Sequence, residues 1–349
     1  MWPTEPSTDG RPGTRRSAAD RLAIYLDAAL DTAVATGSTD ALEAVVELPA
    51  ADERDELIAL LAIHDLSMSP LWTTGGRERF AGHPAVAALK WRLEGALVER
   101  LEARASAFEV GVDDPVAAVR RIAAADLVPA VYGWLADDAD WDQLVAFLTL
   151  EGGPDAGFDD LVALAQVGLH GGPKVTMGAN YWDEMGCGDT TAVHTSLHDR
   201  LVAAIGMPRL PREELPASAL ERCATGGLLA TNHALQPEAL GAFGLIELQA
   251  GPRCRAVVRA LRRLDAPADA FPFYEEHAEA DPRHGKEWLD HVIAPLCGEH
   301  PSWGVRIVQG ALWRHEANRR FFADAHERCA PEHAPLVARI SGRLDLVGR

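Results

Sequence analysis

The chain has 349 residues, 48% of them hydrophobic, so it can bury a substantial core as one large domain or two. Its 52 acidic and 33 basic residues give a formal net charge of −19, which argues against binding to nucleic-acid phosphates or to an anionic membrane surface. The five cysteines are odd in number and widely spaced, which indicates neither a disulfide framework nor a zinc–thiolate site. We therefore expect a protein of the reducing cytoplasm.

The N-terminal part of the chain predicts a tail followed by helices. Residues 1–16 are rich in Pro, Gly, Ser and Thr and lack an apolar segment, so we expect a disordered tail and no signal peptide. From Ser17 onward, apolar residues recur with helical spacing, and alternating runs typical of strands are absent. The sequence predicts an all-α fold with an N-terminal helical region at 17–110 and a main domain at 111–349. The first region shows no recognisable chemistry and either packs against the main domain or forms a dimer surface.

The first candidate ligand is Glu151, which ends a helix predicted at 141–150. A buried ionised carboxylate needs a partner, and a metal ion is one; emergence into solvent is the alternative. The following Gly-Gly-Pro sequence breaks the helix before the next one at 158–167, which leaves the geometry of Glu151 open and makes Asp155 a substitute.

Glu184 and His194 form the second candidate element. Ten residues of unbroken helix would separate them by about 15 Å, too far to bind one metal pair. Gly186 and Gly188 are placed to end the helix between them, and Asp189 or Thr190 can cap the segment that carries His194. His198, four residues further on, is a competing candidate.

A long apolar helical stretch at 219–249 supplies the next carboxylate, Glu247. Because this residue lies within an apolar face, it would be carried into the core. Gly241 and Gly244 on the same stretch would let another helix or a substrate approach closely.

The last element is His277, Asp281 and His284, at positions i, i+4 and i+7 of a helix predicted from Phe271 to Trp288. This spacing projects two imidazoles and a carboxylate from one narrow arc, although a solvated polar helix has the same composition. Pro282 removes a helical hydrogen bond at a cost of roughly 3 kcal/mol, and we interpret it as a kink at a metal site.

Together these elements predict one site in which four carboxylates offset the charge of two divalent ions and three neutral imidazoles complete the coordination. Mixed carboxylate and imidazole ligands from several helices suit a non-haem di-iron or di-manganese centre. The predicted metal ligands are Glu151, Glu184, His194, Glu247, His277, Asp281 and His284, and the residues expected to line a substrate pocket are Tyr181, Trp182, Asn232 and Arg319. We predict no catalytic residue beyond the ligands.

The run from about residue 141 to 296 resembles the haem-oxygenase-like di-iron oxidase and oxygenase superfamily of iron-containing redox enzymes. The similarity rests on the Glu151 helix, on NYWDEMGCGDTTAVH, on the Gly241 to Glu247 helix, and on His277-x3-Asp281-x2-His284 followed by Gly285 and Trp288; RIVQGALWRHEANRRF resembles the family's closing helix.

The resemblance implies a seven-helix haem-oxygenase-like bundle that binds no haem and assembles two Fe(II) ions, with a manganese–iron pair as the alternative. It implies that O2 is the co-substrate for oxidising a small molecule, commonly an amino acid or a fatty acid in natural-product biosynthesis. The acidic balance of the chain favours an amine or amino-acid-like metabolite. N-oxygenation is favoured, followed by oxidative C–C cleavage, with decarboxylation and desaturation also found in the family. An external electron donor and a homodimer are compatible with this expectation.

Three alternatives stay open: a cofactor-free thiaminase-like or metabolite-binding protein on the same fold, a haem-binding protein, and a purely structural helical protein.

Overall fold

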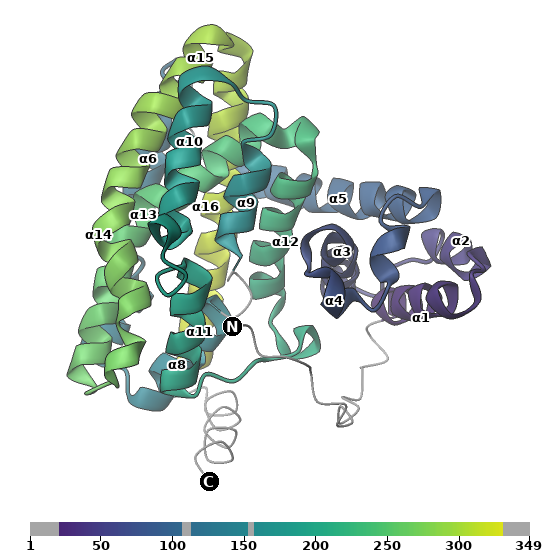
Figure 1. Ribbon diagram of the computed structural model, residues 1–349, viewed down its shortest axis with the longest axis horizontal. Coiled ribbons are helices and arrows are strands. Elements are labelled where there is room, and N and C mark those ends of the chain that lie inside the picture. Colours follow the sequence, from purple (N-terminus) through teal and green to yellow (C-terminus); the bar gives the residue numbers. More distant parts are fainter. Residues whose placement is uncertain (1–20, 107–112, 153–156, 331–349) are drawn as a thin grey trace.

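The computed structural model describes residues 21–106, 113–152 and 157–330, and every regular element within these ranges is a helix (Figure 1). The expected all-α fold is therefore confirmed. The predicted tail at 1–16, the proposed boundary near 110 and the substitute ligand Asp155 lie outside the described residues. Among the described helices, none combines the length and the apolar character needed to cross a lipid bilayer.

The N-terminal helical region comprises α1 (Arg21–Thr36), α2 (Asp40–Val46), α3 (Glu53–Met68), α4 (Leu71–Thr74) and α5 (Pro84–Ala105). The first four helices gather at one side of the molecule, and α5 runs from them towards the main bundle (Figure 1). Asp55 of α3 is fully buried and accepts hydrogen bonds from the backbone amides of Leu22 and Ala23, each at 2.9 Å. Because the first amides of a helix have no partner within it, this carboxylate both caps α1 and joins it to α3.

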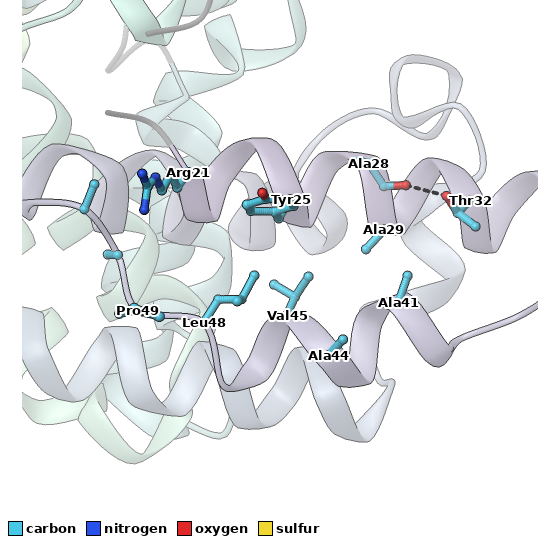
Figure 2. A pocket seen from close by; sticks show the side chains of 12 residues that line it. Arg21, Tyr25, Ala28, Ala29, Thr32, Ala41, Ala44, Val45, Leu48 and Pro49 are labelled. Carbon is cyan, nitrogen blue, oxygen red and sulfur yellow. Dashed lines mark hydrogen bonds between the residues drawn. The ribbon is translucent and has the colours of Figure 1, made fainter. Parts of the chain in front are cut away.

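An open groove of about 840 Å³ lies between α1 and α2 (Figure 2). Its lining consists mainly of Ala, Val, Leu and Pro side chains with Tyr25 and Thr32, and the Thr32 hydroxyl donates to the carbonyl of Ala28 at 2.8 Å. No residue predicted as a metal ligand or substrate contact lines this groove. The groove, the largest of the cavities described for this structure, is therefore not part of the predicted metal or substrate site.

The main bundle contains the remaining α-helices, together with a π-helix at Trp288–Ile293 and short 3-10 turns. The α-helices are α6 (Pro115–Ala125), α7 (Ala130–Asp137), α8 (Trp141–Glu151), α9 (Phe158–Ala165), α10 (Gly171–Glu184), α11 (His194–Ile205), α12 (Ala217–Thr231), α13 (Gln236–Arg263), α14 (Pro272–Glu287), α15 (Ala294–Glu299) and α16 (Pro301–Cys329). The largely buried α13 is central and packs against α14 and α16. The sequence predicted one helical stretch at 219–249, and this prediction is wrong in one respect. The chain leaves α12 at Asn232 and turns through His233–Leu235 before α13 begins.

Glycines let the backbones of the central helices approach one another closely. A Cβ atom on Gly241 of α13 would overlap the carbonyl oxygen of Ile307, and one on Gly310 of α16 would overlap that of Glu238. A Cβ on Gly244 would meet the ring of Trp288, whose Nε1 donates to the carbonyl of Leu240 at 2.9 Å. The small residues of α13 therefore admit a neighbouring helix and a large aromatic side chain, as their size predicts.

The N-terminal region is fastened to the bundle by packing and by ion pairs. Helix α3 packs against α12, and α5 against α16. Arg320 of α16 lies 2.6 Å from Glu53 of α3 and 2.7 Å from the buried carboxylate of Glu221 on α12. One guanidinium thus joins three helices from both parts of the chain.

Candidate metal centre

The turn after α10 brings Glu184 and His194 together. Gly186, Cys187 and Gly188 adopt left-handed backbone angles, with φ of 60°, 52° and 92°. A Cβ on Gly186 would lie 2.6 Å from the carbonyl carbon of Ala192, so the reversal requires glycine there. Helix α11 then begins at His194, and Nδ1 of His194 lies 2.6 Å from Oε2 of Glu184.

The cap of α11 differs from the expectation. Asp189 accepts hydrogen bonds from the backbone amide and the hydroxyl of Thr191, at 2.9 and 2.8 Å, and so stabilises the turn. The residue before α11 is Val193, whose side chain makes no capping hydrogen bond. The helix break thus lies at the predicted glycines, but the predicted cap by Asp189 or Thr190 is wrong.

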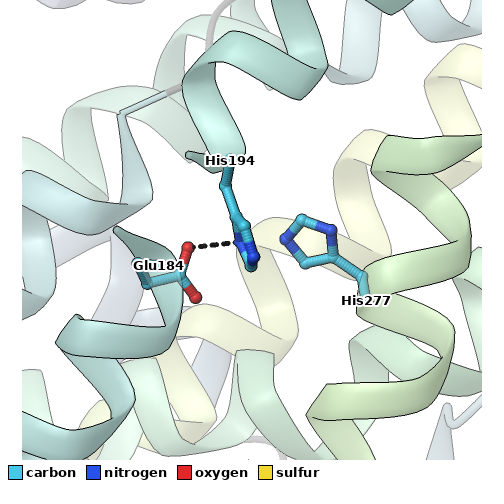
Figure 3. A group of neighbouring side chains, drawn as sticks. All are labelled: Glu184, His194 and His277. Carbon is cyan, nitrogen blue, oxygen red and sulfur yellow. Dashed lines mark ion pairs between the residues drawn. The ribbon is translucent and has the colours of Figure 1, made fainter. Parts of the chain in front are cut away.

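The first group of possible ligands comprises Glu184, His194 and His277, which project towards one another from α10, α11 and α14 (Figure 3). One ligand atom from each residue lies within 4.8 Å of the others, and the two imidazole centroids are 4.4 Å apart. Nδ1 of His277 lies 2.6 Å from the carbonyl oxygen of Phe273. Since a carbonyl only accepts, Nδ1 carries the hydrogen and Nε2 keeps the lone pair that a metal needs.

The second group comprises Glu184, Glu247 and His284, again with ligand atoms within 4.8 Å of one another. Nε2 of His284 lies 2.9 Å from Oδ2 of Asp183, so the carboxylate fixes the hydrogen on Nε2 and leaves Nδ1 for a metal. Asn180 donates to Glu247 at 3.0 Å. Glu184 belongs to both groups, so its carboxylate lies where the two groups meet.

Asp281 lies beside the second group. Its Oδ1 is 3.8 Å from Nδ1 of His284, and Nδ1 is 3.6 Å from Oε2 of Glu247. Both separations are too long for a hydrogen bond. Asp281 is therefore adjacent to the two overlapping groups without a direct hydrogen bond to His284.

Buried polar atoms without hydrogen-bond partners test whether these residues fit a metal. Two of them belong to predicted ligands: Oδ2 of Asp281 and Nδ1 of His284. An unpaired buried polar atom costs about 1–3 kcal/mol, and a metal ion satisfies several lone pairs at once. The predicted ligands include no thiolate, and carboxylate with imidazole suits iron or manganese. The residues present thus fit a two-metal centre.

Burial and neighbouring charges shift the pKa values of the candidate ligands. Burial, followed by repulsion from His194, lowers the pKa of His277 to about 4. Burial lowers the pKa of His284, but the carboxylates of Glu247 and Asp183 outweigh it and raise that pKa to about 9. Burial, then the negative charges of Glu247 and Glu184, hold the pKa of Asp281 well above its usual range. A bound cation stabilises deprotonated ligands, so it would oppose the raised pKa values of His284 and Asp281 and lower that of His277 further.

Pro282 does not interrupt α14, which remains α-helical from Pro272 to Glu287. Proline cannot donate to the carbonyl of Ala278, four residues earlier, and the Arg255 guanidinium donates to it at 2.9 Å instead. Gly251 of α13 makes room, since a Cβ there would lie 2.8 Å from the proline ring. The helix that carries His277, Asp281 and His284 is thus continuous.

Glu151 belongs to neither group in the structure. Its carboxylate accepts a hydrogen bond from the Tyr132 hydroxyl, and it lines a separate cavity of about 80 Å³ with Arg222 and Arg253. The competing candidate His198 lies one turn beyond His194 and lines a third cavity.

Sequence reasoning missed three polar residues near the site. Asn180 donates a hydrogen bond to Glu247, and Asp183 accepts one from His284. Asn180 lies one helical turn before Glu184 and Asp183 lies directly before it, and this proximity in sequence could have identified them. Burial, then the negative charges of Asp160 and Glu184, raise the pKa of Asp159, which places this carboxylate within electrostatic range of the shared ligand. Asp159 stands in the first turn of α9, where an acidic residue is unremarkable in sequence.

The four residues expected to line the substrate pocket are not gathered at the metal groups. Asn232 donates to Glu94 of α5 at 3.1 Å, and Arg319 pairs with Glu316 at 2.7 Å with its side chain largely exposed. Trp182 is 55% exposed and lies against Gly188, whereas Tyr181 is half-buried against the core. None of the four lines a cavity described here.

Comparisons with known proteins agree with the donor set. No curated protein matches the chain. A family model described as iron-containing redox enzyme matches residues 145–319, half of the chain, and this range contains every predicted metal ligand. The N-terminal helical region lies outside the match. The chain belongs to the family of iron-containing redox enzymes.

Proposed function

We propose that this protein is a non-haem di-iron oxidase or oxygenase that uses O2 to oxidise a small amine or amino-acid-like metabolite. The observation that carries the proposal is the shared carboxylate of Glu184, which belongs to both three-residue groups. Two metal ions in paired sites lie about 3.5–4 Å apart and commonly share a bridging ligand.

The ligands divide between two ions. His194 and His277 would hold the first ion, while Glu247, Asp281 and His284 would hold the second, and Glu184 would bridge them. Three carboxylates offset three of the four positive charges of two ferrous ions. A fourth carboxylate would complete the balance, and the candidates are the predicted Glu151 and Asp159, whose pKa the negative charge of Glu184 helps to raise.

The bound irons would supply electron transfer and O2 activation, and the chain itself supplies geometry and a dry environment. Asp183 and the Phe273 carbonyl each hold one imidazole hydrogen and so orient the ring nitrogen that faces the site. Glu184, Glu247 and Asp281 are nearly inaccessible to water, which strengthens their charge interactions. N-oxygenation of an amine is the favoured reaction and oxidative C–C cleavage the next.

Anaerobic titration of the metal-free chain with Fe(II) tests the proposal. We expect two ions per chain, one fewer in His277→Ala and in His284→Ala, and no change in His291→Ala, which removes an exposed imidazole. Exposure of the loaded protein to O2 with a panel of amines and amino acids should then give an oxidised product by mass spectrometry. Failure of the chain to bind iron would instead favour the cofactor-free or metabolite-binding alternative.

A further inference from the structure

A cavity of about 370 Å³ lies between the N-terminal region and the bundle. Its apolar walls come from Leu61 of α3, Val202 of α11, Leu220 of α12 and the 206–216 linker, which contributes Met207, Pro208, Leu210 and Leu215. Small-molecule sites are typically about 300–1,000 Å³, mostly apolar, with a few placed polar groups. Size and lining thus fit a ligand site.

His198 is the polar group buried in this wall. Its residue surface is 6% exposed, and neither ring nitrogen forms a hydrogen bond within the described part of the chain. Burial lowers the pKa of His198, so the ring is neutral at pH 7 and carries one lone pair and one N–H. A buried polar side chain without a partner is rare, and a ligand that hydrogen-bonds to it removes the cost.

The wall that holds His198 also adjoins the metal centre. His198 follows His194 by one turn of α11. The ring of Phe273 lies 5.1 Å from that of His198 and 4.5 Å from that of His277, measured between centroids. His198 and Phe273 therefore stand between the cavity and the first metal group.

The N-terminal region holds the outer wall of the cavity in place. Arg212 of the linker forms two hydrogen bonds with Asp65 of α3, at 2.6 and 2.9 Å. Arg54 of α3 donates to the carbonyls of Leu215 and Glu213. Since the linker supplies most of the outer lining, α3 determines whether the cavity is closed.

Charges at the cavity favour a cationic or neutral head group over an anionic one. Arg212 is paired with Asp65, and Arg209 lies 3.5 Å from Asp199, so both arginines of the lining already have a carboxylate partner. An ionised carboxylate beside the neutral His198 would be poorly compensated. An alkyl amine is an ammonium ion at pH 7, so its N–H donates to the imidazole lone pair, and the Asp199 carboxylate in the same lining offsets its charge.

We propose that this cavity, closed by the N-terminal region, binds a small alkyl amine whose head group donates to His198. The proposal assigns a role to helices that lie outside the family match: they complete a ligand site beside the metal centre.

Calorimetric titration of the full chain with n-hexylamine, with and without anaerobic Fe(II), tests this inference. We expect binding to the wild type, at least tenfold weaker binding of hexanoate, and loss of amine binding in Val202→Trp and Leu210→Trp, two independent substitutions that fill the cavity. Val175→Trp on the exposed face of α10 is the matched control and should bind normally. His198→Ala should weaken amine binding about tenfold, which corresponds to about 1.4 kcal/mol.

Normal amine binding by folded Val202→Trp or Leu210→Trp would overturn the location of the site, and so would an absence of hexylamine binding to the wild type. Equal affinity for hexanoate, or no effect of His198→Ala, would overturn the head-group selection. Iron stoichiometry separates the two proposals: two bound irons without amine binding contradict this inference alone, whereas amine binding without iron contradicts the proposed function alone.

Discussion

Replacement of Asp183 by asparagine is expected to weaken binding of the second metal ion. Asp183 accepts from Nε2 of His284 at 2.9 Å and so fixes which nitrogen faces Glu184 and Glu247. Asparagine keeps an accepting oxygen but loses the negative charge. Removal of a carboxylate that holds a metal-bound histidine typically lowers metal affinity by roughly 10- to 100-fold. This range equals about 1.4–2.8 kcal/mol, and we expect the lower half because one acceptor remains.

Stepwise anaerobic calorimetry with Fe(II) measures the effect. The affinity for the second ion should fall, while that for the ion held by His194 and His277 changes little. Asp199→Asn removes the same charge from an exposed position on α11 and should leave both affinities unaltered. Metal-free Asp183→Asn should melt within a few degrees of the wild type. Equal weakening of both ions, or unchanged affinity for the second, would refute the assignment of Asp183 to His284.

Three further substitutions test the fold. Gly241→Ala should destabilise the protein by about 1–3 kcal/mol in denaturant unfolding, because the new methyl group overlaps a carbonyl of α16; Gly133→Ala, on an open helix surface, should be neutral or slightly stabilising, and equal effects would contradict the packing argument. Asp55→Ala should cost about 1–3 kcal/mol by leaving buried amides of α1 unpaired, and an unchanged melting temperature would count against the cap. The hydrogen bond from Arg320 holds the pKa of Glu53 below its usual 4.5. The ionised Glu53 carboxylate therefore stabilises the folded state fully above pH 4.5, and this stabilisation is lost as pH falls through the lower pKa of the folded state. Glu53→Gln should remove that acid-dependent part of the unfolding free energy, and an identical pH profile would show that the pair contributes nothing.

Local sequence features predicted several of the groupings at the candidate metal centre because they act over a few residues. Glycine at 186 and 188 permits the left-handed turn that ends α10, so the return of the chain to His194 was foreseeable. Helical spacing placed His277 and His284 on one face of α14. The small residues of α13 predicted that another helix packs closely against it. Pro282 leaves α14 α-helical, and the donor that replaces its missing N–H comes from Arg255 on another helix, which no local pattern shows.

The sequence by itself determined that the chain is helical, where α10 and α11 separate, and which face of α14 carries the imidazoles. Each of these depends on backbone preferences or periodicity within one segment. Only the tertiary structure decided that Glu184 is shared by two groups, that Glu151 meets Tyr132 outside both groups, and that Asn232 and Arg319 lie away from them. These outcomes depend on how helices far apart in the chain pack, and the side-chain atoms that meet across such contacts leave no local pattern to read.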